Sequence, residues 1–363
     1  MRRALGLVLA GILLIGVVVA IIVSRGDRSG PTRTLVTVRG VIGSEKRPFF
    51  DDPRVRAELR RKGYRVEVDT AGSRQIATSV DLSGYDFAFP AGAPAGEKIK
   101  REHDLSSSYT VFYTPMVIAS WSPIATLMDE AGVVKPEGGW YSFDVAAFLK
   151  LVDENTRWSD LPGNTAYPAG KSILVTSTDV RTSNSAAMYL SLASYVANGN
   201  NIVQNTGEAD AVVPKVAPLF LRQGFTAASS EEPFEDYLAI GIGKTPMVMI
   251  YEAQFLSRVF ARDGSITPEM VLMYPQPDVL SKHTFVPVTP RGDEIGRLLL
   301  GDPALERLAN DYGFRTTHPA PFLREVEDSG VEIPETIVDL IEPPSYEPLE
   351  EMIVRIERLY RQA

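Results

Sequence analysis

Three stretches of this sequence share one pattern: a strand-like apolar run ends in a loop rich in Gly, Ser and Thr, and that loop opens a helix. The runs cover residues 34–41, 64–69 and 172–175, and the loops after them contain Ser44, Ser73 and residues 181–185. Strands that alternate with helices are typical of a parallel sheet with helices on both faces. The pattern therefore predicts an α/β fold, and its loops are the first place to look for function.

Each of these loops also supplies hydrogen-bond donors at a helix start. The first N–H groups of a helix have no partner within the helix, and the helix dipole gives them a partial positive charge. Ser, Thr and Asn side chains add further donors beside them. One such turn is commonly only a helix cap, but three in one α/β chain predict a shared site for an anionic or polar ligand.

The composition restricts the class of protein. With 363 residues, 44% of them hydrophobic and 23% charged, the chain has the composition of a folded globular protein and the length for two or more domains. The formal net charge of −9 argues against nucleic-acid binding through a broad basic surface. The absence of cysteine excludes disulfides, thiolate metal sites, a cysteine nucleophile and a lipidated N-terminal cysteine.

The N-terminus predicts a membrane anchor. Residues 4–23 are uncharged and mostly aliphatic, which is enough for a helix of about 30 Å that spans a bilayer. The stretch is long for a cleavable signal peptide and is followed by a poor cleavage site, so an uncleaved signal anchor is favoured over a cleaved one. Arg2 and Arg3 favour a cytoplasmic N-terminus. We expect a single-pass protein of the cell membrane whose folded part is extracytoplasmic.

The rest of the chain alternates between further strands and helices. Strands are expected at residues 86–89, 111–120, 271–274 and 284–288. Helices are expected at residues 53–62, 73–80, 123–130, 143–153, 185–197, 210–222 and 302–312. Residues 348–363 place Leu349, Met352, Ile353 and Ile356 at helical spacing, which predicts an amphipathic helix that docks on another surface.

Several of these segments together resemble a known family. The most specific stretch runs from VLMYPQP at residue 271 through TFVPVTPRGDEIGRLLL to DPALERLANDYGFR, which ends at Arg315. Other segments are TVRGVIGSEK, AGSRQIATSV, KSILVTSTDVRTSNSAAMYLSLASYVANG and MVMIYEAQFL. In order and spacing they resemble the type 2 extracytoplasmic solute-binding proteins, in particular the molybdate- and sulfate-like substrate-binding proteins of ABC transporters.

The resemblance implies two doubly wound α/β lobes that are joined by two crossover strands, the type 2 periplasmic-binding-protein fold. Residues 1–33 would be the N-terminal transmembrane anchor and linker. Lobe one would comprise residues 34–114 and 271–363, including a C-terminal extension, and lobe two residues 115–270. The ligand would be enclosed between the lobes.

The candidate ligand-binding residues come from the loops and from one strand end. They are Ser44, Lys46, Ser73, Arg74, Thr182, Ser183, Asn184 and Tyr251. Arg74 can pair with a carboxylate, phosphate or sulfate through two hydrogen bonds, and Lys46 supplies a second cation. Each residue also has a plain structural alternative, such as a helix cap for Ser73, a surface ion pair for Arg74 and a buried aromatic for Tyr251.

Two acidic residues bear on the ligand's charge. Glu45 lies beside Ser44, where it would oppose an anion, and Glu252 follows Tyr251, where it would suit an amine-bearing ligand. The acidic pair Glu231–Glu232 is interpreted as part of a cap or solvated turn.

Catalytic patterns are missing from the sequence. The three histidines have no metal-ligand or triad-like spacing, and no phosphate-binding loop is present. We therefore expect no enzyme, no metal site and no cofactor. The predicted function is that of a membrane-anchored solute-binding protein that captures a small polar, anionic ligand and presents it to an ABC permease or another membrane complex. The alternative is the same fold reused as a sensor or assembly module of a membrane complex.

Overall fold

The computed structural model describes residues 34–224 and 226–362. The predicted anchor over residues 4–23 lies outside the described residues. Within the described ranges, none of the helices combines the length and the apolar character that are needed to cross a bilayer.

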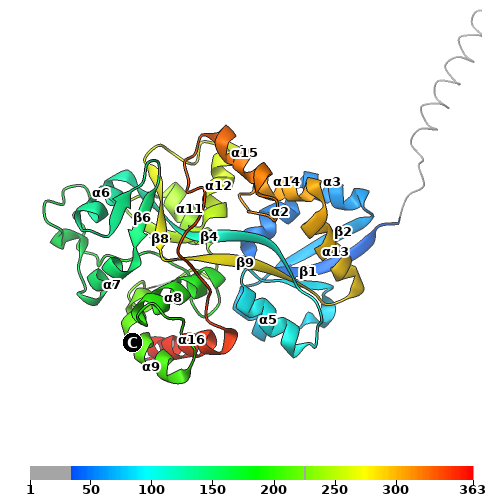
Figure 1. The fold of residues 1–363 in the computed structure, drawn as a ribbon, viewed down its shortest axis with the longest axis horizontal. Helices are drawn as coiled ribbons and strands as arrows, with labels where there is room; N and C mark the ends of the chain where they lie inside the picture. The colour runs from blue at the N-terminus through cyan, green and yellow to red at the C-terminus, as the bar shows by residue number, and fades with distance from the viewer. Residues whose placement is uncertain (1–33, 225, 363) are drawn as a thin grey trace, which may run out of the picture.

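One half of the molecule, called here the first half, is a sheet with helices on both faces (Figure 1). Its central strands are β1 (Val36–Ile42), β2 (Tyr64–Thr70) and β3 (Phe87–Phe89), which run parallel in the order β2-β1-β3. One face packs against α2 (Arg47–Asp51), α3 (Pro53–Arg61), α13 (Pro290–Gly301) and α14 (Pro303–Asp311). The other face packs against α4 (Ser73–Thr78) and α5 (Ala93–Glu102). The alternation predicted for this region is confirmed.

The other half, the second half, is built on a mixed sheet rather than a parallel one. Here β7 (Met247–Tyr251) and β8 (Met270–Gln276) flank the long strand β4 (Tyr109–Trp121) in antiparallel pairing. β6 (Tyr141–Asp144) runs parallel to β8. β5 (Val134–Pro136) closes the edge. The expected strand at residues 172–175 is wrong, because the segment around it makes only isolated bridges such as that of Thr176 with Val248.

Helices surround the mixed sheet of the second half. They are α6 (Ser122–Glu130), α7 (Val145–Asp153), α8 (Asn184–Ala197), α9 (Thr206–Val216), α10 (Pro218–Leu221), α11 (Glu231–Ala239) and α12 (Glu252–Ala261). The buried helix α8 lies against β7, and apolar residues of the strands and helices form one continuous core.

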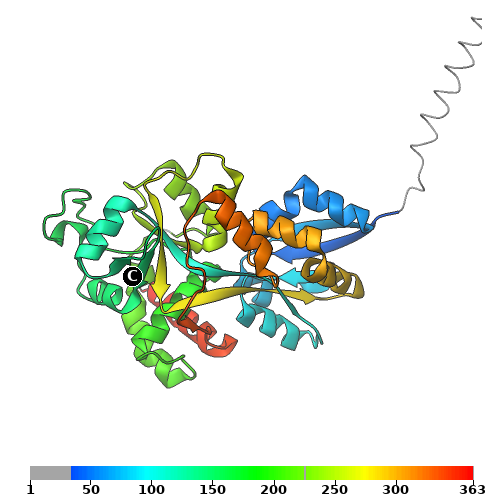
Figure 2. The same cartoon turned by 45° about the horizontal axis from the view of Figure 1, so that its top comes forward.

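Two long strands connect the halves (Figures 1 and 2). β4 (Tyr109–Trp121) pairs with β9 (Asp278–Pro287) along its first part and with β7 and β8 along its last part. β9 in turn pairs with β3 of the first half. The halves therefore share one continuous sheet of order β2-β1-β3-β9-β4-β8-β6-β5, so that motion between them must bend β4 and β9.

The C-terminal segment returns across the molecule. After α15 (Pro319–Ser329) and β10 (Leu340–Ile341), α16 (Tyr346–Tyr360) packs on α8 and α9 of the second half and on α5 of the first. The apolar face predicted from its helical spacing is buried in the core of the second half. The lobe boundaries drawn from the sequence, which assign this helix to lobe one, stay a prediction.

Candidate functional site

A cavity of about 210 Å³ lies where the loops of the two halves meet. Parallel strands β1 and β2 end at the same edge of their sheet, so the loops after them are neighbours. The second half contributes the start of α8, the segment before α11 and the end of β7. Five of the eight predicted residues line this cavity: Ser44, Ser73, Ser183, Asn184 and Tyr251.

The serines of the first half are already engaged with protein groups. Ser73 begins α4 and is buried, and its hydroxyl oxygen accepts a hydrogen bond from the backbone N–H of Ala91 at 2.9 Å. The hydroxyl of Ser44 lies 2.8 Å from that of Ser229 in the second half. This hydroxyl pair joins the two halves directly, so the arrangement described here is a closed one.

The start of α8 forms the opposite wall. Ser183 is the residue before the first turn, but its hydroxyl makes no cap and lies 3.0 Å from that of Ser185. The amide of Asn184 donates to the hydroxyl of Tyr251 at 3.1 Å and to that of Ser281 at 3.3 Å. Burial raises the pKa of Tyr251 well above its ordinary value, so this phenol keeps its proton and can act as a donor.

The other three predicted residues do not line this cavity. The Arg74 guanidinium pairs with Glu350 of α16 at 2.8 Å and donates to the backbone oxygen of Arg181 at 2.9 Å. The hydroxyl of Thr182 donates to the backbone oxygen of Asp179 at 3.4 Å. Lys46 is fully buried.

Lys46 belongs to a buried charged cluster with Glu45 and His283. Its ammonium pairs with Glu45, lies 3.1 Å from Nδ1 of His283 and lies 4.8 Å from the ring centre of Phe89. Burial alone would raise the pKa of Glu45, but Lys46 and His283 lower it to about 2. Burial and the Lys46 charge lower the pKa of His283 to about 4, so the imidazole is neutral at pH 7. The Lys46 charge is thus balanced within the protein.

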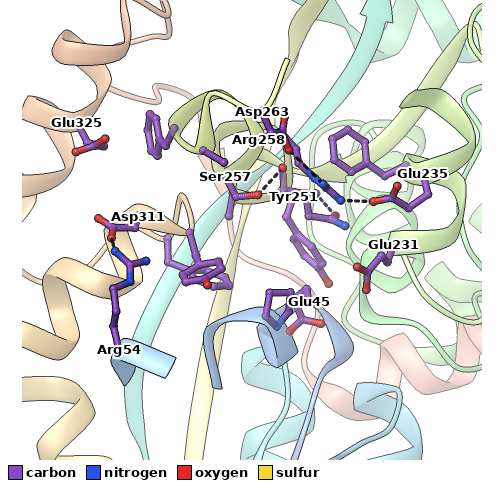
Figure 3. Close-up of a pocket in the computed structure, with 18 residues that line it drawn as sticks. Glu45, Arg54, Glu231, Glu235, Tyr251, Ser257, Arg258, Asp263, Asp311 and Glu325 are labelled. Carbon is purple, nitrogen blue, oxygen red and sulfur yellow. Dashed lines mark hydrogen bonds and ion pairs between the residues drawn. The ribbon is translucent and has the colours of Figure 1, made fainter. Parts of the chain in front are cut away.

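A larger cavity of about 510 Å³ shares two lining residues, Glu45 and Tyr251, with the smaller one, and Figure 3 shows the residues that line it. Its wall also comes from both halves. The first half contributes Pro48, Arg54, Asp311, Tyr312 and Phe314, and the second half contributes residues of α11 and α12 and Asp263 just after α12. A volume of this size is typical of a small-molecule site.

Sequence reasoning missed the larger cavity. Glu231 was interpreted as part of a cap or solvated turn, yet it lies on the cavity wall. The acidic pair Glu231–Glu232 at the start of α11 was the only local signal, and nothing in it indicates which other segments approach. Glu252 was considered for an amine-bearing ligand, but its carboxylate is fully buried and accepts hydrogen bonds from Arg315 at 2.8 Å and from Tyr274 at 2.8 Å.

Among residues 34–224 and 226–362, no group of three or more His, Asp or Glu side chains is arranged to hold a metal ion. The chemistry that the two cavities offer is binding. The smaller cavity presents hydroxyl and amide groups, and the larger cavity presents carboxylates and aromatic rings.

The sequence matches no protein-family model and no curated protein. Its structure is similar to solved structures. A periplasmic thiamin-binding protein superposes with a TM-score of 0.58 at 11% identity, over 92% of this chain and 98% of that one. Iron-bound HitA from Pseudomonas aeruginosa gives 0.54 at 13% identity, over 90% and 99%. The sulfate-binding protein SubI from Mycobacterium tuberculosis H37Rv gives 0.50 at 14% identity, over 85% and 94%.

These likenesses confirm the α/β part of the predicted fold: the described residues have the α/β fold of periplasmic solute-binding proteins. Identities of 11–14% establish the fold alone, because one fold carries many functions. The function has to be argued from the site.

Proposed function

We propose that this chain is a solute-binding protein that captures a small polar molecule between its two halves. The observation that carries the proposal is the meeting of five sequence-predicted residues, from loops of both halves, around one cavity. The fold, shared with solute-binding proteins over about nine-tenths of the chain, supports it. Binding of this kind needs no chemical step, only a higher affinity of the solute for the closed form.

Closure would be a hinge motion in which β4 and β9 bend. The contacts that would break on opening include the Ser44–Ser229 hydroxyl pair and the hydrogen bond from Arg74 to the backbone of Arg181. A solute enclosed by both halves would favour the closed form, which a membrane partner could then recognise.

We further propose that residues 4–23 anchor the protein in the cell membrane, that the folded part is extracytoplasmic, and that the closed form presents the solute to an ABC permease. The support is the length and apolar character of that segment and the arginines before it.

The structure weakens the prediction that the ligand is an anion. The expectation of an anion was based on the donor-bearing helix starts and on the cations Lys46 and Arg74, and each of these cations is paired with a glutamate of the protein. Sulfate, thiamin and iron, named for the three similar structures, also differ in charge, so similarity alone selects no ligand class. We therefore propose a small polar solute here.

The test is calorimetric titration of the full-length chain in mild detergent with sulfate, molybdate, phosphate, thiamin and single amino acids. A solute that binds should also raise the unfolding temperature. Asn184→Ala should weaken binding of that solute about tenfold or more. The substitution removes a buried amide from the cavity wall, together with the hydrogen bond that this amide donates to the Tyr251 hydroxyl. Asn201→Ala, on an exposed loop, is the control and should bind as the unaltered protein does.

Two outcomes would contradict the proposal. One is the absence of any heat or stabilisation with every class of solute. The other is recovery of the chain in a membrane complex without transport components and without bound solute, which would favour the sensor or assembly role instead.

A further inference from the structure

The larger cavity is strongly acidic. Six carboxylates line it, against two guanidiniums, which leaves an excess of four formal negative charges. The six are Glu45, Glu231, Glu235, Asp263, Asp311 and Glu325. Both guanidiniums are already engaged by the protein: Arg54 pairs with Asp52 and Asp311, and Arg258 pairs with Glu235 and Asp263. No cation in this lining is left over to receive an anionic ligand.

Glu231 is the carboxylate best placed to meet a ligand. It begins α11 on the cavity wall, close to Glu45 and Tyr251 (Figure 3). Like Glu325, which lies at the far side of the cavity in Figure 3, it has no ion-pair partner among the described residues, whereas Glu45 is balanced by Lys46. Partial loss of hydration, with the nearby charges of Glu235 and Glu45, raises the pKa of Glu231. A positive ligand would relieve this repulsion, and an anion would increase it.

Five aromatic side chains form a further part of the wall. Tyr251 and Phe314 are almost completely buried, and Phe234, Phe260 and Tyr312 lie around the same cavity. The face of an aromatic ring attracts a cation, and rings combined with a carboxylate are the usual means of holding an alkylated ammonium group. Since no described set of three acidic or histidine side chains can hold a metal ion, the rings and carboxylates together favour an organic cation over an inorganic one.

We propose that this cavity binds a small organic cation, such as a primary or quaternary ammonium compound, with the carboxylate of Glu231 as its anionic partner. The inference rests on the proposed function, since it places a ligand in the larger of two cavities between the halves, which shares Glu45 and Tyr251 with the smaller one. It replaces the anion that the sequence led us to expect.

The experiment is calorimetric titration of the full-length chain, in mild detergent at low ionic strength, with choline and putrescine on one side and sulfate and phosphate on the other. Choline or putrescine should bind, and the two anions should not. Glu231→Gln keeps the shape of the side chain and removes its charge, so it should weaken binding of the cation about tenfold or more. Glu232→Gln is the matched control, because Glu232 is the next residue of α11, is exposed and does not line the cavity.

The remaining outcomes distinguish a failure of this inference from a failure of the proposed function. Binding of sulfate or phosphate but of neither cation would overturn the inference and leave the solute-binding function standing. Equal affinity of Glu231→Gln and the unaltered protein for choline would also overturn it, because the charge would then play no part. Binding of no probe in this experiment or in the wider panel above would overturn both.

Discussion

The guanidinium of Arg74 lies against the carboxylate of Glu350, with Nε donating to Oε2 at 2.8 Å. Arg74 belongs to α4 of the first half, and Glu350 to the C-terminal helix that packs on the second half. The same guanidinium donates to the backbone oxygen of Arg181. One side chain therefore connects the first half, the second half and the C-terminal helix.

This ion pair should make a small, measurable contribution to stability. Both side chains are about one-quarter exposed, so solvent screens part of their attraction. A double-mutant cycle with Arg74→Ala and Glu350→Ala should give a coupling free energy of about 0.5–1 kcal/mol in urea unfolding. The pair Glu357–Arg361 on the same helix is the control, since Arg361 is 74% exposed and its coupling should be smaller. A coupling equal to that of the control would mean that Arg74 does not hold the helix.

The fold of the first half could be predicted because its signals are local. In β1, β2 and the helices after them, the apolar pattern, the capping residues and the turns lie within a few residues of one another. In the second half, the end of β6, residues 143–144, was predicted to begin the helix expected over residues 143–153. It is a strand because Phe143 pairs with Pro275, more than a hundred residues later, and no local pattern encodes that partner.

The candidate site also contains some residues with local sequence signals, which could be predicted, and others whose partners are distant in sequence, which could not. Ser44 and Ser73 could be predicted because each lies in a loop that opens a helix directly after a strand, a local signal. The parallel pairing of β1 and β2 then brings these two loops to one edge of the sheet. The burial of Lys46 against His283 and the pairing of Arg74 with Glu350 could not be predicted, because these partners are 237 and 276 residues away in sequence. The acidic cavity was missed for this reason as well: its carboxylates come from segments that meet only in the folded chain.

Arg315 should be needed to keep Glu252 buried. The two form a pair at 2.8 and 2.9 Å, and Glu252 is fully buried. Arg315→Met would leave an uncompensated buried carboxylate, so the free energy of unfolding should fall by about 3–5 kcal/mol. Arg297→Met, which removes an exposed partner of Asp293, should change it by less than about 0.5 kcal/mol. A loss below about 1 kcal/mol for Arg315→Met would show that burial of Glu252 does not depend on this ion pair.

His283 should make stability depend on pH between about 4 and 6.5. Its pKa is about 4 in the folded protein against 6.5 for an ordinary histidine. Within this window the unfolded chain binds the proton and the folded chain does not, so the free energy of unfolding decreases as the pH falls, by up to roughly 3 kcal/mol. His283→Gln should flatten this window in urea unfolding at a series of pH values, whereas His103→Gln, on the surface, should not. An unchanged slope for His283→Gln would assign the pH dependence to other groups.

Asp278 should make stability decrease as the pH rises, which is the opposite of the effect of His283. Burial raises the pKa of this carboxyl well above its ordinary value, and one of its oxygens has no hydrogen-bond partner among the described residues. The folded chain therefore holds a proton that the unfolded chain has lost, so the contribution of Asp278 to stability decreases as the pH rises above about 3.8.

Asp278→Asn should remove this dependence. The amide oxygen can still accept the hydrogen bond from the backbone N–H of Val279, which Asp278 accepts at 2.6 Å. The variant should gain stability relative to the unaltered protein as the pH is raised from 4 to 8, when both are unfolded in urea. A difference that stays constant with pH would mean that the carboxyl is not protonated in the folded protein.

Gly72 should control how closely the two halves approach. A Cβ atom at this position would lie 2.2 Å from the backbone oxygen of Thr182 in the second half, too close for any stable contact. The backbone of Gly72, at φ −63° and ψ 145°, would accept alanine without strain, so only closure should be affected. Gly72→Ala should therefore unfold at nearly the same urea concentration and favour a more open arrangement.

Hydrogen exchange measured by mass spectrometry can detect that opening without a ligand. In Gly72→Ala, exchange should be faster in residues 226–230, because the contact of Ser44 with Ser229 would no longer form. Solute affinity should fall in proportion to the lost closed population, by about tenfold for each 1.4 kcal/mol by which opening is favoured. Gly84→Ala is the control, since a Cβ there meets no atom within 4 Å. Unchanged exchange in Gly72→Ala would mean that the halves do not close at this contact, and that the bending of β4 and β9 is not what brings the two sets of loops together.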